Sequence, residues 1–148
     1  MLVPLKPLHD YATIKRVVVS SYQSASGAGA AATMELMNQA KAWSNGNSLE
    51  VNAFAHQLLF NVIPHIDSFT DNGYTKEEMK MFNETQKMLH SNDIKVSATC
   101  VRVPVLTAHS ESIYIETEKK LTTEKAREIL SNAAGVRLYD NPDEKQYP

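Results

Sequence analysis

The chain is poor in cysteine, in net charge and in long apolar runs, and each shortage excludes a class of protein. Its single cysteine, Cys100, excludes an internal disulfide and a cysteine-rich metal site. A reducing compartment, the cytoplasm, is therefore the expected location. Lysine and arginine number 15 against 17 acidic residues, so the strongly basic surface of a nucleic-acid-binding protein is not expected. No apolar run approaches the ~18 residues of a membrane-spanning helix, so no membrane partner is expected.

The composition is that of a globular domain. The chain has 148 residues, of which 43% are hydrophobic and 22% charged. This length is typical of one domain with a core of its own. We therefore expect residues 1–148 to form a single domain.

Hydrophobic patterning predicts alternating strands and helices. The β-branched run Val17–Val19 indicates a buried strand, and Leu36, Ala40 and Trp43 recur at helical spacing in an alanine-rich stretch. Together the elements predict an α/β (α+β) fold, a mixed β-sheet covered by helices. The predicted strands are 16–22, 95–104, 112–118 and a short last one, 136–139. The predicted helices are 30–43, 75–90 and 122–135. We expect a short helix or turn within 1–12, and irregular chain with at most one strand over 49–73.

A capping box is predicted at the start of the second long helix. Thr75 is followed three residues later by Glu78, the spacing at which a threonine hydroxyl and a carboxylate satisfy each other's backbone donors. Glu77 and Lys80 then lie on one face of that helix. They could form a weak solvated ion pair, or converge on a zwitterionic or phosphorylated ligand.

The turn after the first strand could bind an anion. Gln23 is followed by a serine- and glycine-rich segment, Ser24–Gly29, which opens a helix. Backbone N–H groups at such a helix start can hold an anion. The segment matches neither the P-loop nor the dinucleotide fingerprint. A tight turn of small residues that allows close packing is the alternative.

Arg102 and His109 are the other candidates. Arg102 lies in a strand otherwise made of apolar and small residues, and its guanidinium needs an acceptor if it is buried. It could form a salt bridge, lie on an exposed strand face, or hold a substrate carboxylate by two hydrogen bonds. His109 lies in the loop between two strands and is either simply exposed or suited to proton transfer at neutral pH.

No metal site is expected, and the cysteine has two interpretations. The remaining histidines form no metal-ligand spacing. Cys100 could be a nucleophile, because Arg102 shares its strand face. A thiol in the middle of a strand more often behaves as a small buried hydrophobe.

Four segments of the chain together resemble the aspartate-semialdehyde dehydrogenase family, in the order in which they occur. The Gln-x-x-Ser-Gly turn and an arginine and histidine seven residues apart are specific when found together. The segments are 17–29 (VVVSSYQSASGAG), 61–67 (NVIPHID), 75–80 (TKEEMK) with Glu84-Thr85, and 101–110 (VRVPVLTAHS).

The resemblance implies a fold, a reaction and a set of site residues. The fold would be the catalytic and dimerisation domain of the glyceraldehyde-3-phosphate-dehydrogenase-like type, forming a homodimer. The reaction would be the reversible, NADP-dependent reductive dephosphorylation of aspartyl phosphate to aspartate semialdehyde, on the route to lysine, methionine and threonine. The implied roles are acid/base for His109, substrate binding for Gln23, Glu77, Lys80 (phosphate) and Arg102 (carboxylate), and NADP contact for Ser26 and Gly27.

The chain also departs from the family in ways that limit the activity to be expected of it. The family's nucleophile lies in an Asn-Cys segment just before the point where this chain begins, and Cys100 matches a non-catalytic strand cysteine. The domain that binds most of the NADP is not in the sequence. We therefore expect this polypeptide to be inactive alone. The alternative is a non-catalytic dimerisation or ligand-binding module that shares the fold.

Overall fold

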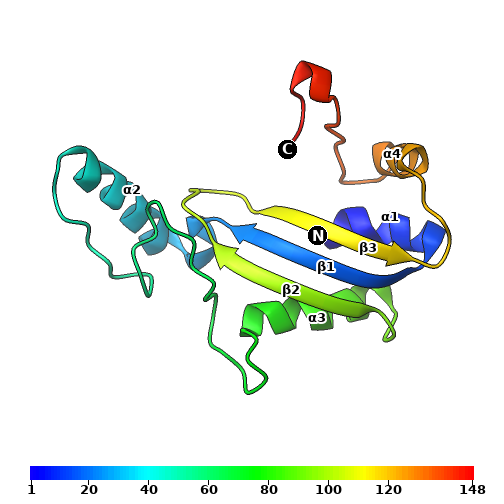
Figure 1. The fold of residues 1–148 in the computed structure, drawn as a ribbon, viewed down its shortest axis with the longest axis horizontal. Helices are drawn as coiled ribbons and strands as arrows, with labels where there is room; N and C mark the ends of the chain where they lie inside the picture. Colours follow the sequence, from blue (N-terminus) through cyan, green and yellow to red (C-terminus); the bar gives the residue numbers. More distant parts are fainter. The chain divides into compact units, whose positions relative to one another are not determined.

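A computed structural model describes all residues from Met1 to Pro148 and divides the chain into two compact units. Three strands form one sheet in the order β2-β1-β3. Figure 1 shows β1 and β2 running in one direction and β3 in the other, so the sheet is mixed, which confirms the predicted fold class. The strands are β1 (Ile14–Gln23), β2 (Lys95–Arg102) and β3 (Ser110–Thr117).

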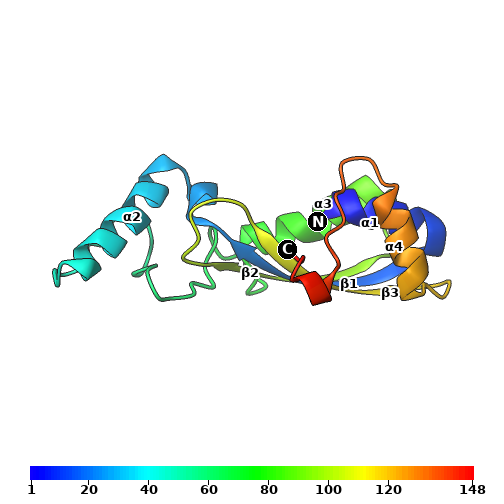
Figure 2. The same ribbon diagram turned by 90° about the horizontal axis from the view of Figure 1, so that it is seen from above.

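The first unit contains the two chain ends. It comprises residues 1–18, 81–97 and 113–148. In it α1 (Leu2–Ala12) packs against α4 (Thr123–Ser131), and α1 lies on the same side of the sheet as the last part of α3 (Lys76–Leu89) (Figure 2). The buried apolar side chains of this unit are Leu5, Leu8, Ala12, Ile14, Val17, Leu89 and Ile94.

Two prolines are accommodated in α1. Pro4 lies in the first turn, where no backbone N–H has a helical partner, and Pro7 lies inside the helix. The helix ends where Thr13 adopts a positive φ of 52°, and its N–H donates to the His9 carbonyl at 2.8 Å. The His9 ring also caps the turn, because its Nδ1 accepts a hydrogen bond from the N–H of Ile14. His9 is therefore a structural residue.

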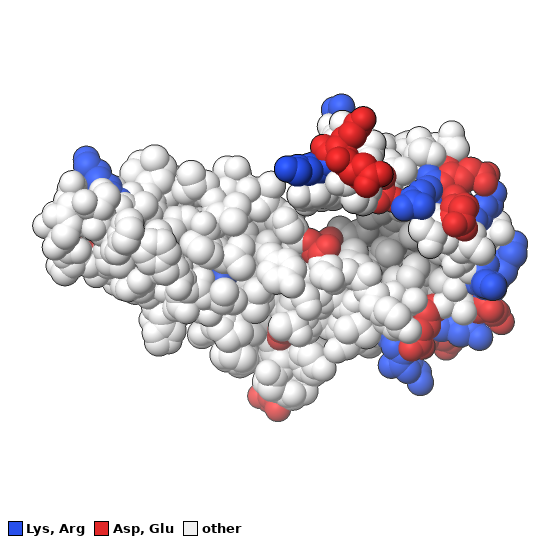
Figure 3. All heavy atoms as spheres, turned by 45° about the horizontal axis from the view of Figure 1, so that its top comes forward, with Lys and Arg blue, Asp and Glu red and all other residues white.

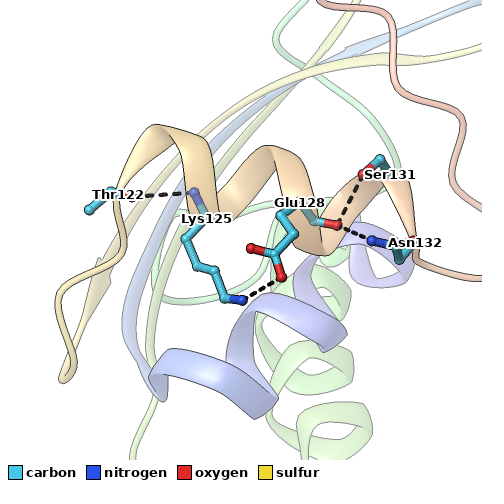
Figure 4. A network of polar contacts seen from close by, with 5 residues as sticks. All are labelled: Thr122, Lys125, Glu128, Ser131 and Asn132. Carbon is cyan, nitrogen blue, oxygen red and sulfur yellow. Dashed lines mark hydrogen bonds and ion pairs between the residues drawn. The ribbon is translucent and has the colours of Figure 1, made fainter.

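Polar contacts stabilise α4, which has no fully buried residue. The Thr122 hydroxyl accepts from the N–H of Lys125, and the Lys125 ammonium pairs with Glu128 at 2.6 Å (Figure 4). At the other end the Glu128 carbonyl accepts from Ser131 and Asn132. These bonds satisfy terminal backbone groups that a helix leaves unpaired.

The second unit holds α2 and the long loop that follows it. It comprises residues 19–80 and 98–112 and includes a short helical turn, η1 (Ala25–Ala28), followed by α2 (Ala30–Ser44). Its core cluster consists of Ala25, Leu36, Leu58, Leu59 and Ile63.

The helix α2 is confirmed, but of the three residues at helical spacing only Leu36 is buried. Ala40 and Trp43 are exposed, Trp43 to 59%, where it makes an edge-on ring contact with Phe60. The buried face instead includes Glu35 and Gln39. The visible face of the part that contains α2 carries few charges (Figure 3).

Glu35 and Gln39 are buried because they bind the backbone of the loop. The Glu35 carboxylate accepts from the N–H groups of Asn52 and Ala53. The Gln39 side-chain oxygen accepts from the N–H groups of Leu58 and Leu59, and its amide nitrogen donates to the Glu50 carbonyl. The loop has no regular structure of its own, so these two side chains replace the partners that a sheet would supply.

Two other expectations are settled by the structure. Residues 136–139 form no strand, so that prediction is wrong; the chain leaves α4 through Gly135 at a positive φ of 75° and later forms η2 (Pro142–Glu144). Within 49–73 there is no full strand, but Ile63 forms an isolated bridge to Arg102. None of the helices has the length and apolarity needed to cross a membrane.

Candidate functional site

The second unit contains every residue predicted from the sequence to belong to the site. These residues come from the end of β1, the turn η1, the first turns of α3, the end of β2 and the connection to β3. Hydrogen bonds, ion pairs and close approaches join them to each other or to Ser24. The residues are Gln23, Ser26, Gly27, Glu77, Lys80, Arg102 and His109.

Ser24, which belongs to the candidate turn but was given no role of its own from the sequence, connects two of the candidates. It is fully buried, and its carbonyl oxygen accepts a hydrogen bond from Arg102 Nη1 at 2.8 Å. Its N–H donates to His109 Nδ1 at 3.2 Å, and its hydroxyl oxygen lies 3.2 Å from the same nitrogen and 3.1 Å from the Ser26 hydroxyl. Most of this role belongs to the backbone, so residue type gave no signal for it.

The loop that carries His109 is attached to the turn η1. The N–H of Ala25 donates to the Val105 carbonyl at 2.8 Å, and that of Ser26 donates to the Leu106 carbonyl at 3.0 Å. Ala108 adopts a positive φ of 68° next to the histidine. A non-glycine residue seldom adopts this conformation, and the surrounding contacts must hold it there.

Gly27 lies against both Arg102 and His109. A Cβ placed on Gly27 would lie 2.9 Å from Arg102 Nη1 and 3.0 Å from His109 Cε1. Its φ is not in the left-handed region, so lack of space is the reason for glycine here. Gly29 is the opposite case, with a φ of 96° and nothing within 4 Å of its Cβ position.

Arg102 is a buried cation without a carboxylate partner in the chain. It is 6% exposed, and only one nitrogen of its guanidinium donates to a protein atom, the Ser24 carbonyl. Burial lowers the pKa of its guanidinium, and the nearby Glu77 carboxylate acts in the opposite direction. A guanidinium has donors in a planar fork, so the remaining ones suit a carboxylate or phosphate.

The amino-terminal turns of α3 present Glu77 and Lys80. Glu77 accepts a hydrogen bond from the Gln23 side chain at 3.3 Å and pairs with the Lys80 ammonium at 3.7 Å. Gln23 is 4% exposed, whereas the Lys80 side chain is 57% exposed. The buried Gln23 side chain therefore positions the carboxylate, while the exposed ammonium stays free to move.

The predicted capping box is present and anchors α3 to the sheet. The Glu78 carboxylate accepts from the N–H and hydroxyl of Thr75 at 2.8 and 3.0 Å, and the N–H of Glu78 donates to the Thr75 hydroxyl. Its other oxygen accepts from the N–H of Cys100 at 3.1 Å. Glu78 thus fixes the start of α3 relative to β2.

Cys100 is a structural residue. Its side chain is fully buried. Burial, with a contribution from the Glu78 and Glu77 carboxylates, raises the pKa of its thiol to about 12. The thiol therefore stays protonated at neutral pH, and only the thiolate is a nucleophile.

The chain has no cluster of metal ligands, and a cavity lies apart from the candidate residues. No group of three or more histidine, cysteine or acidic side chains is placed to hold a metal ion. A cavity of about 650 Å³ lies between α2 and the loop 47–53, with Glu35, Asn38 and Asn52 among its lining residues, and none of the predicted site residues lines it.

The arrangement combines a buried guanidinium, a carboxylate, a mobile ammonium and an imidazole. A guanidinium and a carboxylate can hold the two charged groups of an amino acid. An imidazole can hydrogen-bond to, or exchange a proton with, a reacting oxygen. The chain itself offers no reactive nucleophile beside them, because Cys100 is buried.

Comparison with known proteins agrees with the resemblance seen in the sequence. The chain is 57% identical to the aspartate-semialdehyde dehydrogenase of Aquifex aeolicus (strain VF5), over all of this chain and 44% of that protein. It is 50% identical to the Campylobacter jejuni protein of that name, over all of this chain and 43% of that protein. A crystal structure of aspartate semialdehyde dehydrogenase II complexed with ASA from Vibrio cholerae matches 93% of this chain and 41% of that chain, with 47% identity and a TM-score of 0.91.

The chain thus spans less than half the length of the curated relatives it matches. A family model covers almost all of it: residues 5–148 match the family described as semialdehyde dehydrogenase, dimerisation domain. The chain belongs to this family.

Proposed function

We propose that residues 1–148 are the catalytic and dimerisation domain of a larger NADP-dependent aspartate-semialdehyde dehydrogenase. The parent would interconvert aspartyl phosphate and aspartate semialdehyde in the synthesis of lysine, methionine and threonine. The similarity to proteins of that name supports this activity, and so does the arrangement of charged groups in the second unit.

One observation carries most of the proposal. Arg102 is buried, pairs with no carboxylate of the chain and uses one N–H group on the Ser24 carbonyl. A desolvated guanidinium is costly unless an anion completes its hydrogen bonds. The α-carboxylate of aspartate semialdehyde is the anion we assign to it.

The other residues would take complementary roles. Glu77, aligned by Gln23, would hold the substrate amino group, and Lys80 would bind phosphate. Gln23 would also orient the acyl group. His109 would act at the carbonyl oxygen as the acid/base residue. These are the groups that an amino-acid substrate and an acyl-phosphate product require.

Ser26 and Gly27 fit a contact with NADP. The Ser26 hydroxyl is at the surface of the turn η1, and a side chain at Gly27 would collide with Arg102 and His109. A bare backbone of this kind lets a flat group approach closely. The cofactor would accept the hydride, and most of its binding would come from the rest of the parent protein.

The nucleophile must come from outside these residues. In the proposed reaction a thiolate bonds to the aldehyde carbon, a hydride leaves that carbon for NADP, and a phosphate oxygen then displaces the thiolate. Cys100 cannot supply this thiolate, because burial keeps it protonated. We therefore expect the 148-residue chain to show no phosphate-dependent NADPH formation. Activity that is abolished in Cys100→Ser would contradict this expectation.

The complete enzyme offers the direct test of the carboxylate site. Arg102→Lys keeps the charge but loses the fork of donors, so we expect kcat/KM for aspartate semialdehyde to fall roughly ten- to a hundredfold. The phosphate KM should change much less. Arg16→Lys is the matched control, because Arg16 only forms a surface pair with Glu116.

The outcome also separates the proposal from its alternative. Unchanged kinetics in Arg102→Lys would contradict the assigned site. A complete protein without dehydrogenase activity that still dimerises would favour a non-catalytic module that shares the fold.

A further inference from the structure

The contact between Ser24 and His109 determines where the neutral imidazole carries its proton. The Ser24 N–H donates to His109 Nδ1 at 3.2 Å. A backbone N–H can only donate, so Nδ1 must have its lone pair free to accept. A neutral imidazole has one proton, which then resides on Nε2.

We propose that Ser24 is a positioning residue that makes His109 a hydrogen-bond donor at Nε2. This rests on the proposed function, in which His109 acts at the substrate's carbonyl oxygen, but it replaces the acid/base role given there with that of a hydrogen-bond donor that keeps its proton. In this state Nε2 has no lone pair with which to take a proton. The neutral ring instead donates to the oxygen that becomes negative when a nucleophile attacks the carbonyl carbon.

The surroundings of the ring support this orientation. The Nε2 atom lies at the far end of the ring from Ser24, beside Gly27, where an added Cβ would be 3.1 Å away. His109 is otherwise exposed, so a substrate oxygen can reach Nε2. Ser24 itself is completely buried and also accepts from Arg102. One buried residue therefore orients both the carboxylate-binding group and the oxygen-binding group.

This role fits a reaction that needs no proton transfer at that oxygen. When the thiolate bonds to the aldehyde carbon, the carbonyl electron pair moves to oxygen. When hydride leaves, or when thiolate is displaced by phosphate, the same pair re-forms the carbonyl. A donor that keeps its proton throughout can stabilise the charge in each direction. Neutral histidine in triosephosphate isomerase polarises a carbonyl in this manner.

Nuclear magnetic resonance of the ¹⁵N-labelled 148-residue chain tests the hydrogen bond directly. At a pH well above the ordinary histidine pKa of about 6.5, we expect Nδ1 of His109 to show the shift of an unprotonated nitrogen and Nε2 that of a protonated one. A scalar coupling between the Ser24 amide nitrogen and Nδ1 should accompany them. The exposed His56, which has no such partner, provides the reference for a mixture of tautomers.

A side-chain variant shows whether the backbone N–H or the hydroxyl of Ser24 is the hydrogen-bond partner of His109. Ser24→Ala removes the hydroxyl and keeps the N–H, so the coupling and the nitrogen shifts of His109 should persist. A proton on Nδ1, or a tautomer mixture like that of His56, would overturn the proposal. Loss of the coupling in Ser24→Ala would also overturn it, because the hydroxyl would then be the partner that matters.

Kinetics of the complete enzyme test what the donor does. His109→Gln can place an amide N–H near the position of Nε2 but cannot act as an acid or base. We expect kcat to fall about 10²–10³-fold in His109→Ala, the usual loss for one such donor, and at least tenfold less in His109→Gln. Equal losses in the two variants would overturn the donor role.

The results of the two experiments distinguish an error in this inference from an error in the proposed function. Wild-type kcat in both variants would remove His109 from the reaction and contradict its assigned role, while the resonance result would stand. A reversed tautomer together with a large loss in both variants would leave the function intact and overturn only the donor inference.

Discussion

Gly27 and Arg102 approach each other so closely that a single added carbon on Gly27 would lie 2.9 Å from Arg102 Nη1. The same carbon would lie 3.0 Å from His109 Cε1. The backbone of the turn η1 is thus one wall of the space that the guanidinium and the imidazole occupy. This wall has to be a glycine because of its neighbours and not because of its own dihedral angles.

Gly27→Ala should therefore displace both side chains. Overpacking of this kind costs about 1–3 kcal/mol, and we expect a loss of stability of this size in urea unfolding. The ring signals of His109 should shift as well.

Gly29→Ala is the matched control for this prediction. It strains a backbone with φ 96° and ψ 179°, a conformation almost confined to glycine, at a cost of about 1–3 kcal/mol, but meets no atom within 4 Å. It should lower stability and leave the His109 signals in place. Unshifted His109 signals in Gly27→Ala would show that the turn can move away.

The start of α3 could be predicted from the sequence because its determinants are local. A threonine and a glutamate three residues apart satisfy each other, and the structure confirms the pair Thr75 and Glu78. Strand alternation also placed Arg102 and Cys100 on one face of β2, and both are buried in the structure. What the sequence could not show is that the second oxygen of Glu78 binds the amide of Cys100, a residue far along the chain.

The buried face of α2 could not be predicted, for the opposite reason. Glu35 and Gln39 are polar, and they are buried only because an irregular loop needs their hydrogen bonds. The segment 136–139 shows the same limit, since strand propensity expresses packing against neighbours, and this segment is not part of the three-stranded sheet. The role of Ser24 could not be predicted, because its backbone carbonyl and N–H make the hydrogen bonds to Arg102 and His109.

Glu78→Gln should loosen the attachment of α3 to β2. The glutamine has one acceptor oxygen, so an N–H would face either the Cys100 amide or Thr75, and the favourable charge at the helix start is lost. We expect a destabilisation of about 1–3 kcal/mol and faster hydrogen exchange at the Cys100 amide. Glu84→Gln on the same helix, whose carboxylate makes no hydrogen bond or ion pair in the chain, should change neither quantity. Unchanged exchange at Cys100 in Glu78→Gln would refute the anchoring role.

Cys100 should make the stability of the fold decrease at alkaline pH. Its pKa rises from 9.0 to about 12 on folding, so the folded state keeps a proton that the unfolded state loses above pH 9.0. The stabilisation is fully present below pH 9.0 and is lost as the pH rises toward 12. Unfolding free energies should therefore fall more steeply above pH 9.0 in the wild type than in Cys100→Ala, which has no thiol. Parallel curves for the two proteins would contradict the raised pKa.

Dimerisation should involve the exposed face of β1. The apolar residues of segment 58–63 are the alternative location, but Leu58, Leu59 and Ile63 belong to the core cluster of the second unit. On β1, by contrast, Val18 and Tyr22 are each 42% exposed and alternate with buried residues. Exposed apolar strand faces usually mark an interface.

The two locations can be distinguished by light scattering. Tyr22→Asp should shift the chain from dimer to monomer, whereas Phe60→Asp should leave the dimer intact. The reverse result would favour the 58–63 segment. A wild-type chain that is monomeric at high concentration would contradict dimerisation through this domain.

Lys80 and Arg102 should divide the two anions of the reaction between them. Arg102 is buried and held by the Ser24 carbonyl, which suits a carboxylate that stays in one place. The ammonium of Lys80 is at the end of a flexible side chain, 57% exposed and paired with Glu77 at 3.7 Å. A point charge of this kind can follow a phosphate that arrives and leaves.

Lys80→Ala in the complete enzyme should therefore raise the phosphate KM most, by roughly tenfold or more for a lost charged hydrogen bond. The KM for aspartate semialdehyde should change less, although Glu77 loses its neighbour. Lys87→Ala, in the last turn of the same helix, is the control for the loss of a lysine from α3 and should change neither constant. Steady-state kinetics with each substrate varied in turn measure both constants. If Lys80→Ala and Arg102→Lys raised the same KM by the same factor, the two cations would share one anion and the assigned division would be wrong.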